Sequence, residues 1–524
     1  MLVEQAVIQS QISCTLGDAS DKAEQHICWS RCQLSESKES SSRRDFLKIA
    51  GGFAAGAVVA GAVVAATQPA KGPAVTETMT ATVTEAAPAV TSGDINAFRA
   101  ALERDGFIVL EGKLELFDIV RMKDAGLIPS CWGNNPSTPY MVYKLPIAPG
   151  QTIPNHISDA PINPANKGLW GDWRLRLDEA IVLLGRTPPA ASYFSYRSYL
   201  AGRYFGNVPR RIFASLGDTE NHLTIRTSGT PNGAEGNPFD KETIIVTTAD
   251  KGIDDRVRMA AQSAGYSPAI MNTDIIPSGL VKMGLEEKAD SFVFIHRFAF
   301  FQDEDAGNAY MKNPGAVVFR LTPKEPVPLL PYEVQRLRVR GTGNTMELDL
   351  MGALNDLRQA IIAKYSTFNA TELKTSIWLL EGFDGIQREI DVIGENRDTT
   401  YLWTDRFTLK DDPNEFLIVY GINHAATGKV VYSNFGVYGS DILNGVGAVA
   451  SQSLSGTAED YIPGHPAAKY LYAWKVARRA QGDPRCLEVP WGIGAAGIDL
   501  DKECYVGFRA YVEKETKVGP FWSE

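Results

Sequence analysis

The sequence lacks an excess of positive charge and lacks the short motifs that identify a nucleophile or a redox cofactor. Lysine and arginine total 52, aspartate and glutamate total 62, and the net charge is −10. Because nucleic-acid binding usually needs surplus cations to neutralise phosphates, this balance argues against such a role. The chain contains no Cys-x-x-Cys-His, no cysteine cluster for an iron–sulfur centre, no Gly-x-Ser-x-Gly and no P-loop. The cofactor is therefore unknown from the sequence.

Signals for nucleotides and metals are also weak. Gly492–Gly497 matches Gly-x-Gly-x-x-Gly by its letters. In a dinucleotide-binding fold a helix follows these glycines, but the next expected strand begins at Tyr505 and leaves no room for one. The histidines are dispersed, without a His-x-x-x-His or Glu-x-x-His pair. We therefore expect neither a nucleotide site at these glycines nor a metal site.

The composition is that of a globular protein, with 44% hydrophobic and 22% charged residues. A chain of 524 residues can form two or three domains. Changes in composition along the chain divide it into four segments. These are a signal or anchor (1–66), a stalk (67–93), a first α+β half (94–330) and a second α+β half (331–524).

The most specific pattern lies near the N-terminus. Ser42–Lys48 reads Ser-Arg-Arg-Asp-Phe-Leu-Lys, and a mildly apolar run of Ala, Gly and Val follows from Ile49 to Ala66. This arrangement resembles a twin-arginine export signal. The resemblance implies export of a folded protein by the twin-arginine translocase of a prokaryote, to the periplasm, the cell surface or the medium. Small residues before position 67 suit cleavage after Ala66, whereas an uncleaved run could tether the protein to the membrane.

The segment after the signal is rich in Thr, Ala, Val and Pro, which is typical of an extended stalk. Three cysteines follow it, Cys131, Cys486 and Cys504. An odd number excludes a framework in which every cysteine is paired. Cys486 and Cys504 enclose a short loop, so they could form a disulfide in an oxidising compartment if their geometry permits.

Short apolar runs separated by turns predict a strand-rich α+β fold. Ala180–Leu184 is typical of a buried strand, and the aromatic stretch Tyr193–Tyr199 alternates as strands do. Apolar spacing predicts a helix over Thr345–Lys364. Asn369, with Glu372 three residues later, resembles a capping box, and another helix is expected near 467–479.

Two similar stretches suggest that the halves are related. Gly133–Tyr140 and Gly394–Tyr401 both read Gly-x-Asn-x-x-Thr-x-Tyr. Further pairs occur in the same order: Glu179–Gly185 with Glu415–Gly421, Tyr196 with Tyr432, Leu216–Thr219 with Leu454–Thr457, and Val318–Arg320 with Gly507–Arg509. Five ordered pairs predict an internal duplication, with the halves packed about a pseudo-two-fold axis and a pocket between them.

The second copy of the motif carries more ionisable groups than the first, which makes it the better candidate for a site. Arg397 and Asp398 occur in this copy alone. His424 follows an apolar strand, where Asp398 or Asp405 could orient it as a general base. The alternative is structural, since Asn and Asp suit tight turns and His424 could be a turn residue without a role. The predicted catalytic residues are His424, Asp398 and Arg397, and the predicted substrate-binding residues are Asp405, Arg406, Lys429 and Tyr401.

These features favour an exported enzyme that acts on a small molecule by acid–base chemistry, with a hydrolase favoured. The alternative is a cell-envelope protein without catalytic activity that binds a ligand or partner through its aromatic strands. Four aromatic residues motivate this alternative: Tyr193, Phe194, Tyr196 and Tyr199. In both cases contact with a membrane is expected only through the N-terminal segment.

Overall fold

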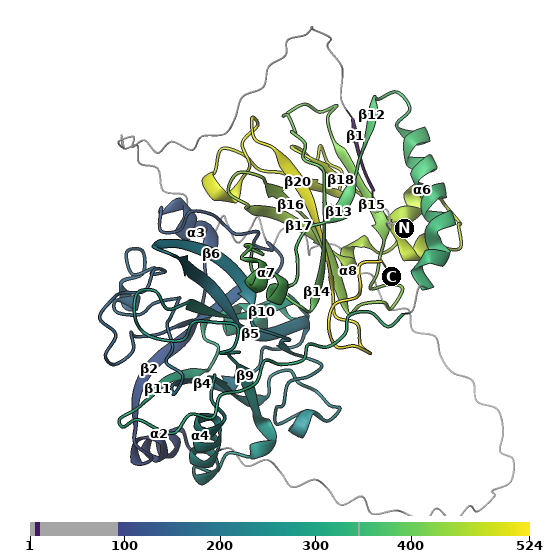
Figure 1. Cartoon of the computed structure of the whole chain (residues 1–524). Coiled ribbons are helices and arrows are strands. Elements are labelled where there is room, and N and C mark those ends of the chain that lie inside the picture. The colour runs from purple at the N-terminus through teal and green to yellow at the C-terminus, as the bar shows by residue number, and fades with distance from the viewer. Residues whose placement is uncertain (1–5, 11–92, 344–345, 524) are drawn as a thin grey trace, which may run out of the picture. The chain divides into compact units, whose positions relative to one another are not determined.

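The computed structural model describes residues 6–10, 93–343 and 346–523 (Figure 1). The twin-arginine stretch, the apolar run after it and the predicted stalk up to residue 92 lie outside the described residues. Within the described ranges, no helix combines the length and the apolar character needed to span a membrane. The strand-rich α+β class is confirmed.

One sheet of ten strands forms the first half, and nine of them follow one another in a continuous path. In order of pairing they are β6 (Val208–Ser215), β5 (Ala191–Phe205), β10 (Ser291–Phe301), β3 (Tyr140–Lys144), β2 (Phe107–Leu116), β11 (Val317–Pro323), β4 (Ala180–Arg186), β8 (Glu242–Thr248) and β9 (Met271–Ile275), with β7 (Glu220–Asn221) beside β5. Strand β2 lies in the middle of this path and joins its two parts, because its first residues pair with β11 and its last with β3.

Two five-stranded sheets form the second half. The first contains β12 (Ala370–Leu373), β1 (Ala6–Ser10), β15 (Leu417–Ile422), β18 (Leu471–Ala477) and β19 (Cys486–Glu488). The second contains β13 (Thr375–Ile377), β14 (Thr399–Thr404), β20 (Cys504–Tyr511), β16 (Tyr432–Gly439) and β17 (Gly445–Ala450).

The helices are short and pack beside the sheets. The α-helices are α2 (Ile95–Arg104), α3 (Ile119–Asp124), α4 (Lys251–Ser263), α5 (Glu304–Lys312), α6 (Met351–Lys364), α7 (Gly382–Arg388) and α8 (Ser451–Leu454). The 3-10 helices are η1 (Pro164–Asn166), η2 (Pro231–Gly233), η3 (Pro268–Ile270), η4 (Met346–Leu350), η5 (Thr457–Asp460), η6 (Ala468–Tyr470) and η7 (Gly494–Ala496). Aspartates start the two helices that cover β2 and β8: Asp94 caps α2 and Asp250 caps α4, each accepting bonds from backbone amides of the first turn.

The central strands of the two halves pair in the same register. In the first half, Arg297 on β10 lies opposite Tyr140 on β3 and Ser195 on β5. In the second half, Arg509 on β20 lies opposite Tyr401 on β14 and Asn434 on β16. Each of these arginines therefore has the same two neighbours in its sheet. The strand on one side carries the motif tyrosine, and the strand on the other side contains several tyrosines.

Two sequence predictions about local structure are wrong, and the open question of the disulfide is answered. The segment 467–479 contains strand β18, preceded by the short η6, rather than a helix. Asn369 precedes strand β12 instead of capping a helix. Cys486 and Cys504 are both buried free thiols on strands of different sheets, so the disulfide does not form. Burial in apolar surroundings also raises the pKa of the Cys486 thiol to about 12, which makes it inert.

Candidate functional site

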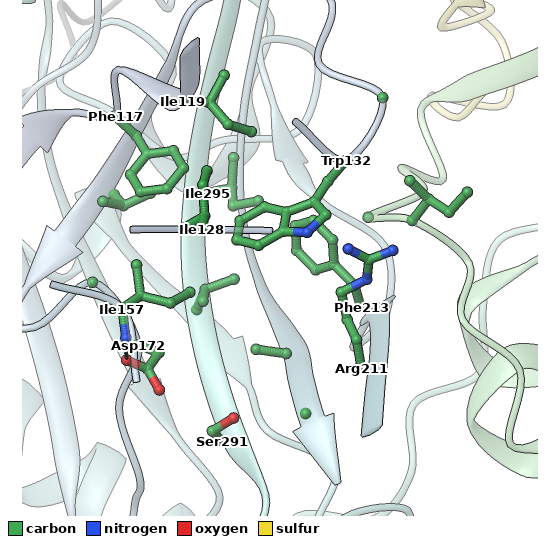
Figure 2. Close-up of a pocket in the computed structure, with 18 of the residues that line it drawn as sticks. Phe117, Ile119, Ile128, Trp132, Ile157, Asp172, Arg211, Phe213, Ser291 and Ile295 are labelled. Carbon is green, nitrogen blue, oxygen red and sulfur yellow. Dashed lines mark hydrogen bonds between the residues drawn. The ribbon is translucent and has the colours of Figure 1, made fainter. Parts of the chain in front are cut away.

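A cavity of about 430 Å³ lies beside the central strands of the first half and is closed by residues of the second half. Figure 2 shows its apolar wall, formed by Phe117, Ile128, Ile157 and Ile295, with the Trp132 indole across the middle of the view. Strand β10 supplies Ile295, the segments on either side of α3 supply Phe117, Ile128 and Trp132, and the loop between β3 and η1 supplies Ile157. Volumes between about 300 and 1,000 Å³ are typical of pockets for small molecules.

Arg297 forms one polar part of the lining. Its guanidinium donates hydrogen bonds to the Tyr199 hydroxyl and, at 2.9 Å, to the carbonyl oxygen of Gly394. It also lies over the rings of Tyr140 and Tyr199, at 5.5 and 4.8 Å from their centroids. These contacts hold the side chain rigidly, because a cation is stabilised over an aromatic face.

Arg509 makes the matching contacts from the other half. Its guanidinium donates to the Tyr438 hydroxyl and, at 2.8 Å, to the carbonyl oxygen of Gly133. It lies 5.0 Å from the centroids of the Trp378 and Tyr438 rings. The two motifs are therefore exchanged: each motif glycine is bound by the arginine of the other half.

Both arginines are buried, and the part of the chain that the structure describes offers neither of them a counterion. Arg297 is 6% exposed and Arg509 is 5% exposed, and neither takes part in an ion pair among the described residues. Burial acts to lower the pKa of each guanidinium, but the surrounding tyrosines outweigh it and the net pKa is raised. Both side chains are therefore charged at any physiological pH, and they place two positive charges at the cavity.

A carboxyl group lies at another edge of the cavity. Asp172 is 1% exposed and accepts hydrogen bonds from the backbone amides of His156 and Ile157, at 2.9 and 2.6 Å. Burial raises the pKa of this carboxyl, although the amides and the nearby Arg174 oppose the rise. The His156 ring lies 3.4 Å from the Arg174 guanidinium. Asp172, His156 and Arg174 all line the cavity.

Three residues that line the cavity have unfavourable backbone conformations. Trp132, Phe213 and Ile393 line it with positive φ angles of 53°, 29° and 55°. A left-handed conformation costs a residue with a side chain about 1–3 kcal/mol, and β-branched Ile393 tolerates it least. Such strain persists where the surrounding structure imposes it, and it is concentrated at binding and active sites.

The predicted site residues do not gather at one place. Tyr401 lines the large cavity. Asp398 is fully buried and accepts hydrogen bonds from Tyr193 and Asn221, both at 2.8 Å, and from Thr219. Arg397 pairs with Asp218 at 2.7 Å and with Glu381. Apart from the pair with Glu381, which lies in the second half, these contacts join the motif to the first half.

The other predicted residues lie elsewhere. His424 pairs with Glu347 at 2.8 Å and Lys429 pairs with Glu513 at 2.7 Å, beside a much smaller cavity of about 60 Å³. Burial acts to lower the pKa of the half-buried His424 ring, but the neighbouring Glu347 carboxylate outweighs it and the net pKa is raised. At the surface, Asp405 accepts a bond from the amide of Lys374, and Arg406 lies 3.4 Å from Glu503.

Sequence reasoning missed four of the main cavity residues, namely Trp132, Asp172, Arg297 and Arg509. Arg297 and Arg509 each stand inside a strongly aromatic strand, where a charged residue is unexpected. A charged residue in such a strand was the sequence feature that could have identified both arginines. Trp132 and Asp172 lie in irregular loops, and the sequence carries no comparable mark for them.

Comparison with known proteins yields no family and no curated relative. The solved structures that match at low similarity include the following two. An uncharacterized protein from Burkholderia cenocepacia shares 13% identity over 79% of this chain and 82% of its own, with a TM-score of 0.33. The VPA0106 protein from Vibrio parahaemolyticus shares 11% identity over 81% of this chain and 94% of its own, with a TM-score of 0.35.

Proposed function

We propose that this protein binds a small, largely apolar molecule that carries an anionic group. The observation that carries the proposal is the pair of buried arginines, Arg297 and Arg509, which line a cavity with a large aromatic and aliphatic wall and form no ion pair with a carboxylate among the described residues. A buried cation is costly unless an opposite charge compensates it. A carboxylate on the ligand would supply that charge and accept the guanidinium hydrogens left over from the Tyr199 and Tyr438 bonds.

Calorimetric titration with decanoate and with decanol tests this proposal, because the two probes share a chain and differ in charge. We expect decanoate to bind with one-to-one stoichiometry and at least about tenfold more tightly than decanol, since a charge-assisted hydrogen bond contributes about 1.5–3 kcal/mol. Filling the cavity with Ile157→Trp should abolish binding. The matched control Leu329→Trp, at an exposed position remote from the lining, should not. Equal affinity for both probes would contradict the proposed charge preference.

An acid–base enzyme, with a hydrolase favoured, is the second candidate. The cavity supports it through Asp172, a buried carboxyl with a raised pKa, which is the environment of a general acid. The neighbouring His156 lies at the exposed edge of the cavity. Catalytic roles for His424, Asp398 and Arg397 stay predictions. Hydrolysis of nitrophenyl esters of graded chain length, compared between the natural protein and Asp172→Asn, would distinguish an enzyme from a binding protein.

We also propose that the two halves arose by duplication and pack about a pseudo-two-fold axis. Support comes from the common register around Arg297 and Arg509, and from the exchanged contacts with Gly394 and Gly133. Export through the twin-arginine route, to a location outside the cytoplasm, stays part of the proposal on the strength of Ser42–Lys48. Replacing both arginines, Arg43 and Arg44, with lysine should leave the protein in the cytoplasmic fraction of a twin-arginine-competent host.

A further inference from the structure

The chain's first strand lies inside a sheet of the second half. Strand β1, Ala6–Ser10, runs between β12 and β15 and is antiparallel to both (Figure 1). Val7 lies opposite Leu373 on one side and Val419 on the other. More than 350 residues separate this strand from its partners along the sequence, so the pairing closes a very long loop.

The pairing of β1 repeats that of β11 in the first half. There, Val318 lies opposite Gly112 on β2 and Leu183 on β4. Every paired residue of β1 has its counterpart 311 positions later on β11, with both neighbours kept in register. The strand order β2-β11-β4-β8-β9 of the first half thus corresponds to β12-β1-β15-β18-β19 of the second. The second half has no strand of its own at this position among residues 346–523.

We propose that the gap between β12 and β15 is a strand-acceptor site and that Ala6–Ser10 of the same chain is its resident strand. Without an occupant, β12 and β15 would stand about 10 Å apart, twice the spacing of neighbouring strands. Both would then leave a row of backbone amides and carbonyls without strand partners. Strand β15 is buried along its whole length, so water would compensate its polar backbone groups poorly.

The strand-acceptor site uses none of the residues that line the ligand cavity. Residues 6–10 precede the twin-arginine stretch, so cleavage after Ala66 would cut the strand away from the half that it completes. The proposal therefore requires that the N-terminal segment remain with the folded protein.

Cysteine cross-linking in the full-length chain tests the site. Cys14, Cys28 and Cys32 are first replaced with serine. Ser10→Cys is then combined with Ala370→Cys, because Ser10 and Ala370 are direct partners across the ladder. Direct partners bring their Cβ atoms close enough for a disulfide after a small adjustment. The control combines Gln9→Cys with Ala370→Cys, because a shift of one residue turns the side chain to the opposite face.

Under mild oxidation we expect an intramolecular disulfide in the matched pair, at least tenfold more abundant than in the control, as peptide mass spectrometry would measure. Equal yields in both pairs would overturn the proposal. A disulfide that joins two chains would overturn it as well, since the occupant would then be a second copy.

A proline substitution provides the second measurement. Ile8→Pro removes a backbone donor from a strand with neighbours on both sides, so the melting temperature of the full-length protein should fall by about 3 °C or more. Gln11→Pro, just beyond the paired residues, should leave the melting temperature unchanged. The proposal fails if the two variants melt at the same temperature.

Discussion

Two arginines in aromatic strands define the chemistry of the cavity. Arg297 and Arg509 are each held over tyrosine rings and bound to a motif carbonyl, so their positions do not depend on a ligand. Preorganised donors bind an anion without the entropy cost of ordering a flexible side chain. The fixed positions of the two arginines thus explain why an anion would be preferred and why the site would be selective.

Neutralising either arginine should remove the charge preference. Arg297→Gln and Arg509→Gln each should weaken decanoate binding about tenfold and leave decanol binding nearly unchanged, because only the charged ligand uses the guanidinium. Calorimetric titration measures both. Arg406→Gln, an exposed residue far from the lining, is the control and should have no effect. A parallel loss for both probes would show that the variants damage the cavity rather than its charge.

Glu395 should make stability depend on pH. Burial, with the nearby Glu381 carboxylate, raises the pKa of Glu395 from its ordinary value of 4.5 to about 7. A raised carboxyl pKa means that the folded state favours the protonated form. The stabilisation is therefore complete below pH 4.5 and disappears as the pH rises through 7, a change of about 3 kcal/mol.

The measurement is the free energy of unfolding in urea between pH 4.5 and 8. Glu395→Gln keeps the bond from the Ser215 amide and removes the titration, so its stability should vary less over this range. Glu325→Gln, at an exposed position, should retain the slope of the natural protein. An unchanged slope in Glu395→Gln would assign the pH dependence to other groups.

The repeated motif is the element that the sequence located best. Within each copy the backbone amide of the asparagine donates to the tyrosine hydroxyl, Asn135 to Tyr140 at 2.7 Å and Asn396 to Tyr401 at 3.0 Å. The motif glycines, Gly133 and Gly394, have φ angles of 69° and 68°, which favour glycine. The residues shared by the two copies thus specify the same turn, and their spacing in the sequence was enough to locate it.

Equivalent strands were harder to match. The sequence paired Arg509 with Arg320 and Tyr432 with Tyr196, but the register places Arg509 with Arg297. Insertions of different length lie between the strands of the two halves. One constant difference in residue number therefore does not match the strands that follow the motif. Strand β18 was predicted as a helix because Leu, Ala, Lys and Trp allow either state, and pairing with β15 decided it.

If the motif is a folding element in both halves, its two asparagines should matter equally. The Asn135 side chain donates to Tyr511 and the Asn396 side chain donates to Tyr193, at 3.1 and 2.7 Å. Asn135→Ala and Asn396→Ala should each lower the free energy of unfolding by about 1–3 kcal/mol, because buried partners lose a hydrogen bond. Asn308→Ala, exposed on α5, is the control for urea unfolding. A loss confined to Asn396→Ala would favour a special role for the second copy.

At the scale of the whole molecule, the exchanged motifs tie the two halves together. Asp398 of the second half receives bonds from Tyr193, Thr219 and Asn221 of the first. Asn434 of the second half donates to Asn135 of the first at 3.0 Å. Buried groups of each motif thus form hydrogen bonds with the other half, so we infer that residues 93–523 unfold as one cooperative unit.

Calorimetry of Asp398→Ala tests this inference. The substitution leaves three buried donors without their acceptor, at a cost of about 1–3 kcal/mol for each group that water does not reach. If the halves are one unit, the natural protein and the variant should each melt in a single transition, and the variant should melt at the lower temperature. Asp405→Ala, whose carboxylate accepts only a surface amide, should melt almost normally. The opposite result would be two transitions in Asp398→Ala, with only the transition of the second half shifted. It would mean that the exchanged contacts do not couple the halves and that each motif stabilises its own half alone.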